Sequence, residues 1–409
     1  MAGSAAHAPE RIRLGLLLLL GALTAIGPLS IDAYLPAMPQ LARELGASPG
    51  AAQLTLSSFF FGLASAQIVW GPLSDRLGRR TPLLMGLALF TVASLGCALA
   101  PTIELLALGR FLQAVGGSAG VVIARAVVRD RWAGREAARV MSLLVLVMGA
   151  APILAPTLGS LLLAFSGWRT IFLALVGFGV LVFVATRLGL SARLPAQAPE
   201  PLARGIGAVL RDRLFVTAAL GAGFSQAGMF AYIAASSFVF VEHHGLSPTA
   251  YAWLFGVNAV GLVVASQINR RLLRFAEPGA IARAAMSVAL VAAVVLAWRA
   301  VSGSLAEHAL LVFVFVSSYG LTTSNATALA LENQVRRAGL ASAVLGSMQY
   351  AVSALATVVV GMLSDGTARA MANVMLGAAI VAVAFLSLAH AAARRRAERA
   401  PALAEGIAE

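Results

Sequence analysis

Two ionisable side chains, Asp32 and Arg110, lie inside long apolar stretches of the sequence. Asp32 follows eighteen residues without a charge, whereas the other sixteen acidic residues fall in polar segments or near the ends of apolar ones. An ionisable group at membrane depth is costly and faces the protein interior or a cavity, so it is a functional candidate. A carboxylate in such a place can carry a proton, and a nearby cation can tune it. We therefore expect Asp32 and Arg110 to form a proton-coupling pair.

These residues can share a depth only if their segments cross a membrane. Apolar residues make up 60% of the 409 positions, charged residues make up only 11%, and the mean hydropathy is +0.88. A soluble domain has nearer one half apolar and one quarter charged residues. A spanning helix needs about 20 apolar residues, and the hydropathy predicts twelve, near residues 14–36, 51–71, 81–100, 103–127, 138–163, 168–187, 214–241, 248–268, 281–299, 307–330, 339–363 and 371–392.

The predicted helix ends place the two residues close in depth. The first helix leaves the membrane near Pro36, and the fourth enters it near Ile103. At a rise of 1.5 Å per residue, Asp32 lies roughly 6 Å and Arg110 roughly 10 Å below the same boundary. An alternative interpretation is a fixed ion pair that only holds two helices together.

The distribution of the basic residues indicates membrane topology rather than binding to a nucleic acid. All thirty cations are arginines and the net charge is +13. If the N-terminus is cytoplasmic, 24 arginines fall in inner segments and four in outer loops, which follows the positive-inside rule. We therefore expect both termini in the cytoplasm, a lipid bilayer around the chain and no nucleic acid.

The sequence favours neither a metal site nor a nucleotide site, and no cofactor is expected. The five histidines fall at the termini, in loops or at helix ends, and His243-His244 is expected in a solvated loop. A phosphate-binding loop of the G-x-x-x-x-G-K type needs a lysine, and the chain has none. The energy for transport would therefore come from an ion gradient.

The chain divides into two similar parts. Residues 1–187 form an N-terminal six-helix half, 188–213 a cytoplasmic linker, 214–392 a C-terminal half and 393–409 a cytoplasmic tail. The linker contains three prolines and four arginines and has little hydrophobic periodicity. A shift of 194 residues places Asp75-Arg76 on Asn269-Arg270, which indicates an internal repeat of about six helices.

The loop after the second predicted helix reads Gly71-Pro-Leu-Ser-Asp-Arg-Leu-Gly-Arg-Arg80. This spacing resembles the loop signature of the major facilitator superfamily of transporters. The resemblance implies an all-α membrane protein whose twelve transmembrane helices form two pseudo-symmetric halves. It assigns a cytoplasmic gate to Gly71, Asp75, Arg76, Gly78, Arg79, Arg129 and Asp130.

Four further stretches resemble signatures of proton-coupled drug exporters. Asp32-Ala-Tyr-Leu-Pro36 and Arg110-Phe-Leu-Gln-Ala-Val-Gly-Gly117 are similar to motifs of the first and fourth helices, and Val128-Arg129-Asp130 follows the fourth. Residues 149–160 resemble the antiporter motif through Pro152, Pro156 and Gly159, with Ala155 and Ser160 where the motif has glycine. Together they resemble the Bcr/CflA group of bicyclomycin and chloramphenicol resistance antiporters.

The resemblance implies a monomeric multi-pass protein of the bacterial inner membrane, not an enzyme, that exports small amphiphilic drugs in exchange for protons. Asp32 would carry the proton, and Arg110 would be the cation that tunes it. A mostly apolar cavity between the halves would suit neutral or cationic compounds, and we expect it to be lined by Tyr34, Phe59, Gln113, Met148, Gln226, Tyr232, Asn258 and Gln349. Each of these could equally be a helix–helix contact. A proton-coupled metabolite carrier on the same fold, working in export or uptake, is the alternative function.

Overall fold

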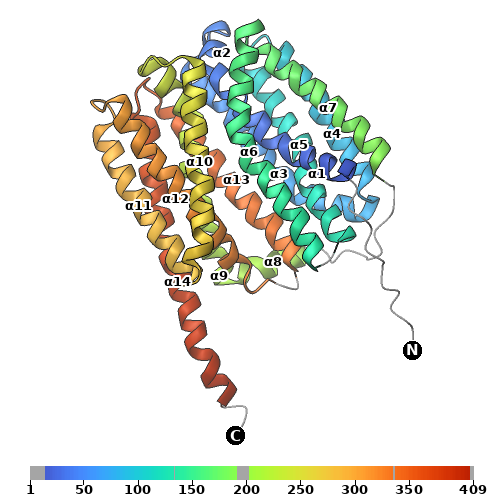
Figure 1. Cartoon of the computed structure of the whole chain (residues 1–409), viewed down its shortest axis with the longest axis vertical. Helices are drawn as coiled ribbons and strands as arrows, with labels where there is room; N and C mark the ends of the chain where they lie inside the picture. Colours follow the sequence, from blue (N-terminus) through green and yellow to red (C-terminus); the bar gives the residue numbers. More distant parts are fainter. Residues whose placement is uncertain (1–13, 133, 191–201, 335–336, 406–409) are drawn as a thin grey trace.

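A computed structural model describes residues 14–132, 134–190, 202–334 and 337–405, and every regular element in these ranges is a helix (Figure 1). The first part contains α1 (Leu14–Asp32), η1 (Leu35–Ala37), α2 (Met38–Glu44), α3 (Pro49–Leu77), α4 (Arg80–Leu99), α5 (Ile103–Arg131), α6 (Gly134–Ser166) and α7 (Arg169–Gly189). The second contains α8 (Leu202–Arg211), α9 (Arg213–Ser237), η2 (Phe238–His243), α10 (Pro248–Leu272), α11 (Pro278–Arg299), α12 (Leu305–Leu331), α13 (Ala338–Leu363) and α14 (Arg369–Glu405).

Twelve helices among the described residues are long and apolar enough to cross a membrane, so the predicted number of spans is confirmed. Several of them end later than the hydropathy suggested, and two include a further helical segment. The first continues through η1 and α2 to Glu44, and the seventh continues through the π-helical turn η2 to His243. Both extensions lie at the same end of the bundle.

The second helix of each half begins in the same way. Ser48 caps α3 by accepting a hydrogen bond from the amide of Ala51 (3.1 Å), and Pro49 follows it. Ser247 caps α10 through the amide of Ala250 (3.2 Å), and a proline again follows. A serine cap satisfies a free amide, and proline at the first helical position loses no hydrogen bond. The matching starts agree with an internal repeat.

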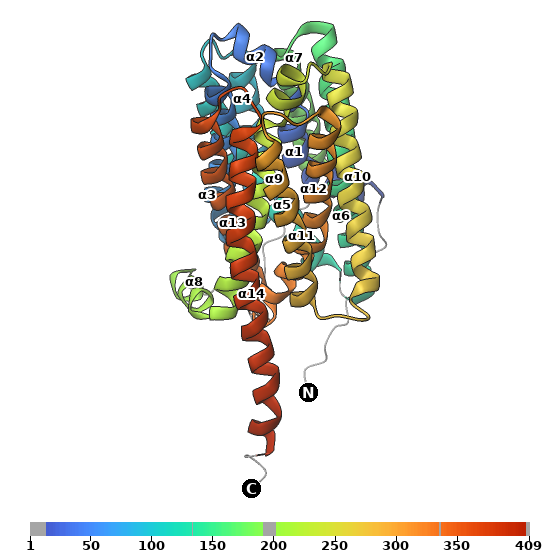
Figure 2. The same ribbon diagram turned by 90° about the vertical axis from the view of Figure 1, so that its left-hand side faces the viewer.

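The helices pack as two bundles, α1–α7 and α9–α14, that stand side by side (Figures 1 and 2). α1 begins and α14 ends at one end of the molecule, which we call the arginine-rich end because the loop after α3 lies there. α2 lies at the opposite end, which we call the α2 end. The bundles meet along two seams, α3 with α13 and α6 with α10, and η1 also contacts α9 and α10.

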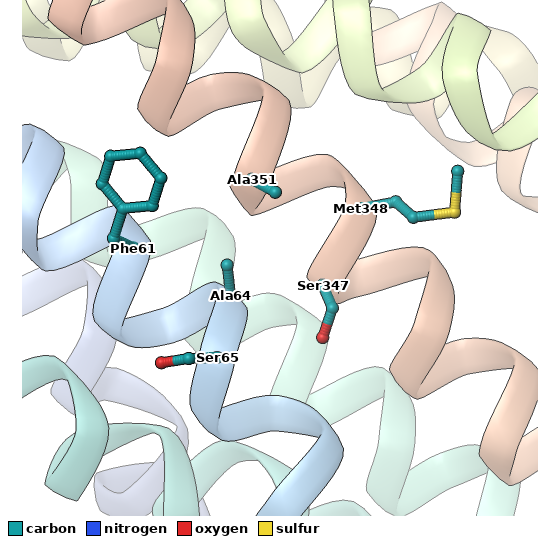
Figure 3. A pocket seen from close by; sticks show the side chains of 6 residues that line it. All are labelled: Phe61, Ala64, Ser65, Ser347, Met348 and Ala351. Carbon is teal, nitrogen blue, oxygen red and sulfur yellow. The ribbon is translucent and has the colours of Figure 1, made fainter. Parts of the chain in front are cut away.

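The α3–α13 seam is closed along its length. Near the α2 end the backbones of Gly50 and Gly361 approach so closely that a Cβ atom at Gly50 would overlap the carbonyl of Gly361. In the middle, Ser57 donates a hydrogen bond to Thr357 (Oγ to Oγ1 2.8 Å). The outer surface of this seam carries an apolar groove of about 380 Å³, lined by Phe61, Ala64, Ser65, Ser347, Met348 and Ala351 (Figure 3).

The interval between the bundles contains one feature that the sequence reading missed. Residues 202–211 form the amphipathic helix α8, which lies across the arginine-rich end and packs on α9 and α13 (Figure 2). The remaining central part of the predicted linker, 191–201, lies outside the described residues. Asp212 then caps α9 through the amide of Leu214 (3.0 Å).

Candidate functional site

Asp32 is the last residue of α1, at the junction of the two bundles. After it the helix gives way to a turn and to η1, which contacts α9 and α10 of the second bundle. Asp32 is 4% exposed, and its carboxylate forms no hydrogen bond or ion pair with any residue that the structure describes. It interacts electrostatically with the phenols of Tyr232, Tyr251 and Tyr350. Asp32 therefore lies within electrostatic range of the second bundle.

The turn after Asp32 is held by the helix with the antiporter-like sequence. A Cβ atom at Gly159 of α6 would overlap the carbonyl oxygen of Ala33, so only glycine allows this approach. Pro152 and Pro156 lie earlier in the same helix, where each removes a backbone hydrogen bond. The structure thus brings the motif to the residue next to Asp32.

Arg110 on α5 is fully buried inside the first bundle. Its Nη1 donates hydrogen bonds to the carbonyl of Ser30 (2.9 Å) and to Oε1 of Gln113 (2.6 Å). The guanidinium lies 4.2 Å from the ring centre of Phe59 and 4.9 Å from that of Tyr34. Nε and Nη2 have no hydrogen-bond partner. The guanidinium therefore lies against aromatic rings rather than against a carboxylate.

The expected ion pair between Asp32 and Arg110 is absent from the described structure. The two residues lie on neighbouring helices, but Arg110 binds the backbone of α1 at Ser30, while Asp32 lies within electrostatic range of Tyr232 in the second bundle. Depth follows from the helical rise, whereas side-chain direction depends on how α1 packs against α5. Arg110 instead holds the last turn of the helix that carries Asp32.

Three residues expected to line the cavity lie inside the first bundle instead. Tyr34 and Phe59 are fully buried against Arg110, and the Tyr34 hydroxyl is bound to Thr55 (2.6 Å). Gln113 is also buried and donates a hydrogen bond from Nε2 to Ser94 (2.8 Å). Their polar atoms are already used to fix Arg110 and the helices around it, which corrects their expected placement between the halves.

The expected residues of the second half are neutral and mostly bonded to one another. Asn258 donates a hydrogen bond to the hydroxyl of Tyr232 (2.8 Å), and its Oδ1 has no partner. Gln226 accepts one from Tyr319 (3.3 Å), and its Nε2 has no partner. Gln349 on α13 is half-buried. Each pair leaves one polar atom free, and roles in substrate binding stay a prediction.

An aromatic cluster that the sequence reading missed joins the two bundles. Phe60 of α3 lies 4.2 Å from Phe230 of α9, measured between ring centres. Tyr350 of α13 stacks near both rings, with plane angles of 22° and 24°. No periodicity could have revealed this cluster, because its members come from three helices far apart in sequence.

Arg125 is a second residue that was missed, although the sequence held a signal. Like Arg110, it is an arginine within a predicted span. It is exposed, and its Nη2 lies 3.9 Å from the Sδ of Met148. It also interacts electrostatically with Tyr350 across the bundle interface. Met148 therefore lies beside a cation.

The loop after α3 is organised around Arg79 at the arginine-rich end. Its Nε donates to Asp130 of α5 (2.7 Å), and its Nη1 donates to Ser74 (2.7 Å) and to Asp75. Burial works against the pKa of Arg79, but the bonds to Asp130 and Asp75 outweigh burial and raise it. Gly78 has a φ of +78°, a conformation that favours glycine.

We call the contacts of Arg79 with Ser74, Asp75 and Asp130 the Arg79 brace. This brace differs from the expected gate because its contacts stay within the first bundle. Arg76 is exposed, and Gly71 is packed beside α5 at Val122. The contact with the second bundle comes from Arg129, whose guanidinium lies against Gly339 at the start of α13. Of the predicted gating residues, Arg129 is thus the one that this structure places between the bundles.

At the α2 end the bundles are linked by an ion pair between Arg43 and Glu242 (2.9 Å). Beside it, His244 is hydrogen-bonded to His308 (Nε2 to Nδ1 2.8 Å), and His308 is fully buried. The expectation of a solvated loop is therefore met only in part, because His243 is exposed but ends the helical turn η2, and His244 follows that turn but is half-buried. The described part of the chain shows no group of three or more His, Cys, Asp or Glu side chains that could hold a metal ion.

Comparison with known sequences identifies similar membrane transporters. Residues 19–357 match the profile described as Major Facilitator Superfamily. An uncharacterised MFS-type transporter, YdgK of Bacillus subtilis, is 38% identical over 92% of this chain and 96% of its own. A bicyclomycin resistance protein homologue of Haemophilus influenzae is 29% identical over 90% and 94%. The multidrug resistance protein MdtL of Klebsiella pneumoniae is 28% identical over 89% and 93%.

Solved structures share the fold at low sequence identity. An inward-facing bacterial homologue of the human lysosomal transporter Spinster matches with a TM-score of 0.71 and 17% identity, over 94% of this chain and 98% of that one. A D-xylose–proton symporter matches with a TM-score of 0.70 and 14% identity, over 90% and 96%. These matches agree with the two-bundle architecture described above.

Proposed function

The chain belongs to the major facilitator superfamily, and we propose that it exports small amphiphilic drugs across the bacterial inner membrane in exchange for protons. Relatives named for bicyclomycin and multidrug resistance support the choice of cargo. The observation that carries the proposal is the unpaired carboxyl group of Asp32 at the junction of the bundles.

Protonation of Asp32 would change how the two bundles meet. A neutral carboxylic acid can be buried beside the phenols of Tyr232, Tyr251 and Tyr350 and can donate a hydrogen bond to them. A carboxylate without a partner is costly in an apolar surrounding and needs water or a donor group of the substrate. We propose that the neutral form favours release at the α2 end, and that the ionised form binds substrate from the arginine-rich end.

Three arginines would support the action of this carboxyl group. Arg110 is a positioning residue in this scheme, because it holds the last turn of α1 through the Ser30 carbonyl. The Arg79 brace would keep α3 and α5 moving as one body, while Arg129 would make and break the contact with α13. The excess of arginines at their end supports a cytoplasmic location for that end and for both termini.

The test is drug export by purified protein in liposomes with a pH gradient. We expect Asp32→Asn to remove proton-driven transport of chloramphenicol while the protein stays folded, because asparagine keeps the size of the side chain but carries no titratable proton. Asp365→Asn is the matched control. Asp365 lies in the loop between α13 and α14, bound to Thr367 (2.6 Å), far from the junction.

Two results would contradict the proposal. Unchanged proton-driven export by the Asp32→Asn variant would show that the proton travels elsewhere. Transport of a sugar or organic acid by the wild type, without transport of any drug, would favour the metabolite carrier. The same liposomes, measured with the gradient reversed, separate export from uptake.

A further inference from the structure

Arg125 is an exposed cation within a membrane-spanning helix. It lies six residues before the end of α5 and touches the thioether of Met148. Among the described residues no carboxylate forms an ion pair with it. Ionisable residues within a spanning helix commonly face a pathway for a ligand.

The face of α5 that carries Arg125 points toward the second bundle. Arg129 follows four residues later, on the same side of the helix, and it lies against Gly339 of α13. Arg125 itself interacts electrostatically with Tyr350, which lies further along α13 than Gly339. Asp32 interacts with Tyr350 as well. An unpaired cation and an unpaired carboxyl group therefore both lie within electrostatic range of one tyrosine.

The side chains packed around Tyr350 are flat apolar rings. Phe60 and Phe230 lie next to it, with ring centres 6.4 Å and 6.0 Å away. Such rings suit a planar aromatic body, and the two ionisable groups suit polar groups at its ends. Met148 is unbranched, so it can adapt to ligands of different shape.

We propose that Arg125 is a specificity-determining residue that binds an anionic or hydrogen-bond-accepting group of the exported compound. The flat part of the compound lies against Phe230 and Tyr350, which are half-buried, and a donor group lies toward Asp32. This inference rests on the proposed function and narrows its substrate class. Anionic and neutral aromatic amphiphiles are favoured over cations, whereas the sequence alone suggested neutral or cationic ones.

Three compounds with one ring system test the preference: 2-naphthoate, 2-naphthamide and (2-naphthylmethyl)trimethylammonium. Each competes with chloramphenicol export in liposomes, and each is also titrated directly onto the purified protein. We expect the wild type to prefer the anion to the cation by roughly tenfold or more, the scale of one charge-assisted hydrogen bond. Arg125→Gln should remove this preference, and Arg125→Lys should largely retain it.

Two further variants make the result specific. Arg125→Met keeps an unbranched side chain beside Met148 and tests the loss of charge if the glutamine variant does not fold. Arg283→Gln removes an exposed arginine from α11, which packs on α12 and α14 away from the bundle interface, and should keep the wild-type preference.

The inference is overturned if the neutral variants rank the three compounds as the wild type does, or if the wild type prefers the cation. Failure of the proposed function would look different. Chloramphenicol export would then be absent or independent of the pH gradient, while the direct titrations would still report the effect of Arg125.

Discussion

The two bundles share a helix pattern but not their chemistry. The first holds Asp32, Arg110 and Arg125 within its spans, whereas the corresponding interior of the second holds neutral groups such as Tyr232 and Asn258. The first bundle therefore bears the charges within its spans, and the second provides phenols and amides. The proposed role of Asp32 in proton coupling depends on this unequal distribution.

The same contrast appears at the arginine-rich end. In the first bundle, Arg79 joins Asp75 and Asp130 by charged hydrogen bonds. The internal repeat places Asn269 where Asp75 stands, and there Asn325 donates to Asn269 (Nδ2 to Oδ1 2.7 Å). Both braces join the second helix of a bundle to the fourth, one with charges and one with amides. The position of the brace is thus retained although its charge is not.

The largest difference in transport activity is expected between two variants, one in each bundle, in which Arg110 or Asn258 is replaced by leucine. Arg110→Leu should reduce transport at least tenfold with little loss of thermal stability, because replacing a poorly paired buried charge by an apolar side chain is often neutral or stabilising. Asn258→Leu should leave most transport intact, because it removes one neutral hydrogen bond worth about 1 kcal/mol. Liposome transport and thermal unfolding of the purified variants measure both effects.

Equal losses of transport in the two variants would contradict the expected difference between the two bundles. A fall in stability without a loss of transport in Arg110→Leu would show that Arg110 is a packing residue. Arg110→Lys gives a useful intermediate, since it keeps the charge but lacks the planar group that lies against Phe59 and Tyr34.

A smaller difference, in the free energy of unfolding, is expected between the Arg79 brace of the first bundle and the Asn269–Asn325 pair of the second. Arg79→Gln should lower the free energy of unfolding by about 1 to 2 kcal/mol, a range that allows for the nearly half-exposed carboxylates beside it. High salt should reduce this difference from the wild type, because it screens the ion pairs. Asn325→Leu should cost a similar or smaller amount that does not depend on salt. Thermal unfolding in low and high salt tests this, and equal salt dependence in both variants would contradict it.

Hydropathy and spacing were sufficient to predict the twelve spans, and they also singled out Asp32. The depth of a residue follows from its distance to the helix end, so Asp32 and Arg110 could be placed near one level. The direction of each side chain could not be predicted, because it depends on the rotation of α1 and α5 after packing. For this reason the predicted ion pair was wrong, although both residues are buried.

Other features depend on contacts that a single sequence does not encode locally. The approach of Gly159 to Ala33 and the cluster of Phe60, Phe230 and Tyr350 join helices from distant parts of the chain. α8 could have been found, since it begins directly after the last of the linker prolines, where a helix is free to start. Composition drew attention to the prolines rather than to the apolar face that follows them.

The smallest expected effect concerns a titratable group of the second bundle, His244 at the α2 end. Burial lowers its pKa, and the neighbouring His308 and His243 lower it further. The folded protein therefore resists the proton that the unfolded chain binds once the pH falls below about 6.5, the ordinary value for histidine. Stability should be full above this pH and should fall as the pH drops toward the lowered pKa, by at most about 1.4 kcal/mol per pH unit.

Thermal unfolding of the purified protein from neutral to mildly acidic pH measures this dependence, and His244→Gln should flatten it. His390→Gln is the matched control, because His390 lies on α14 near Glu277 (3.9 Å) at the arginine-rich end and should leave the dependence in place. A wild-type stability that does not change over this range would contradict the prediction. A dependence that persists in His244→Gln would assign it to another group, such as the buried His308 that is bonded to His244.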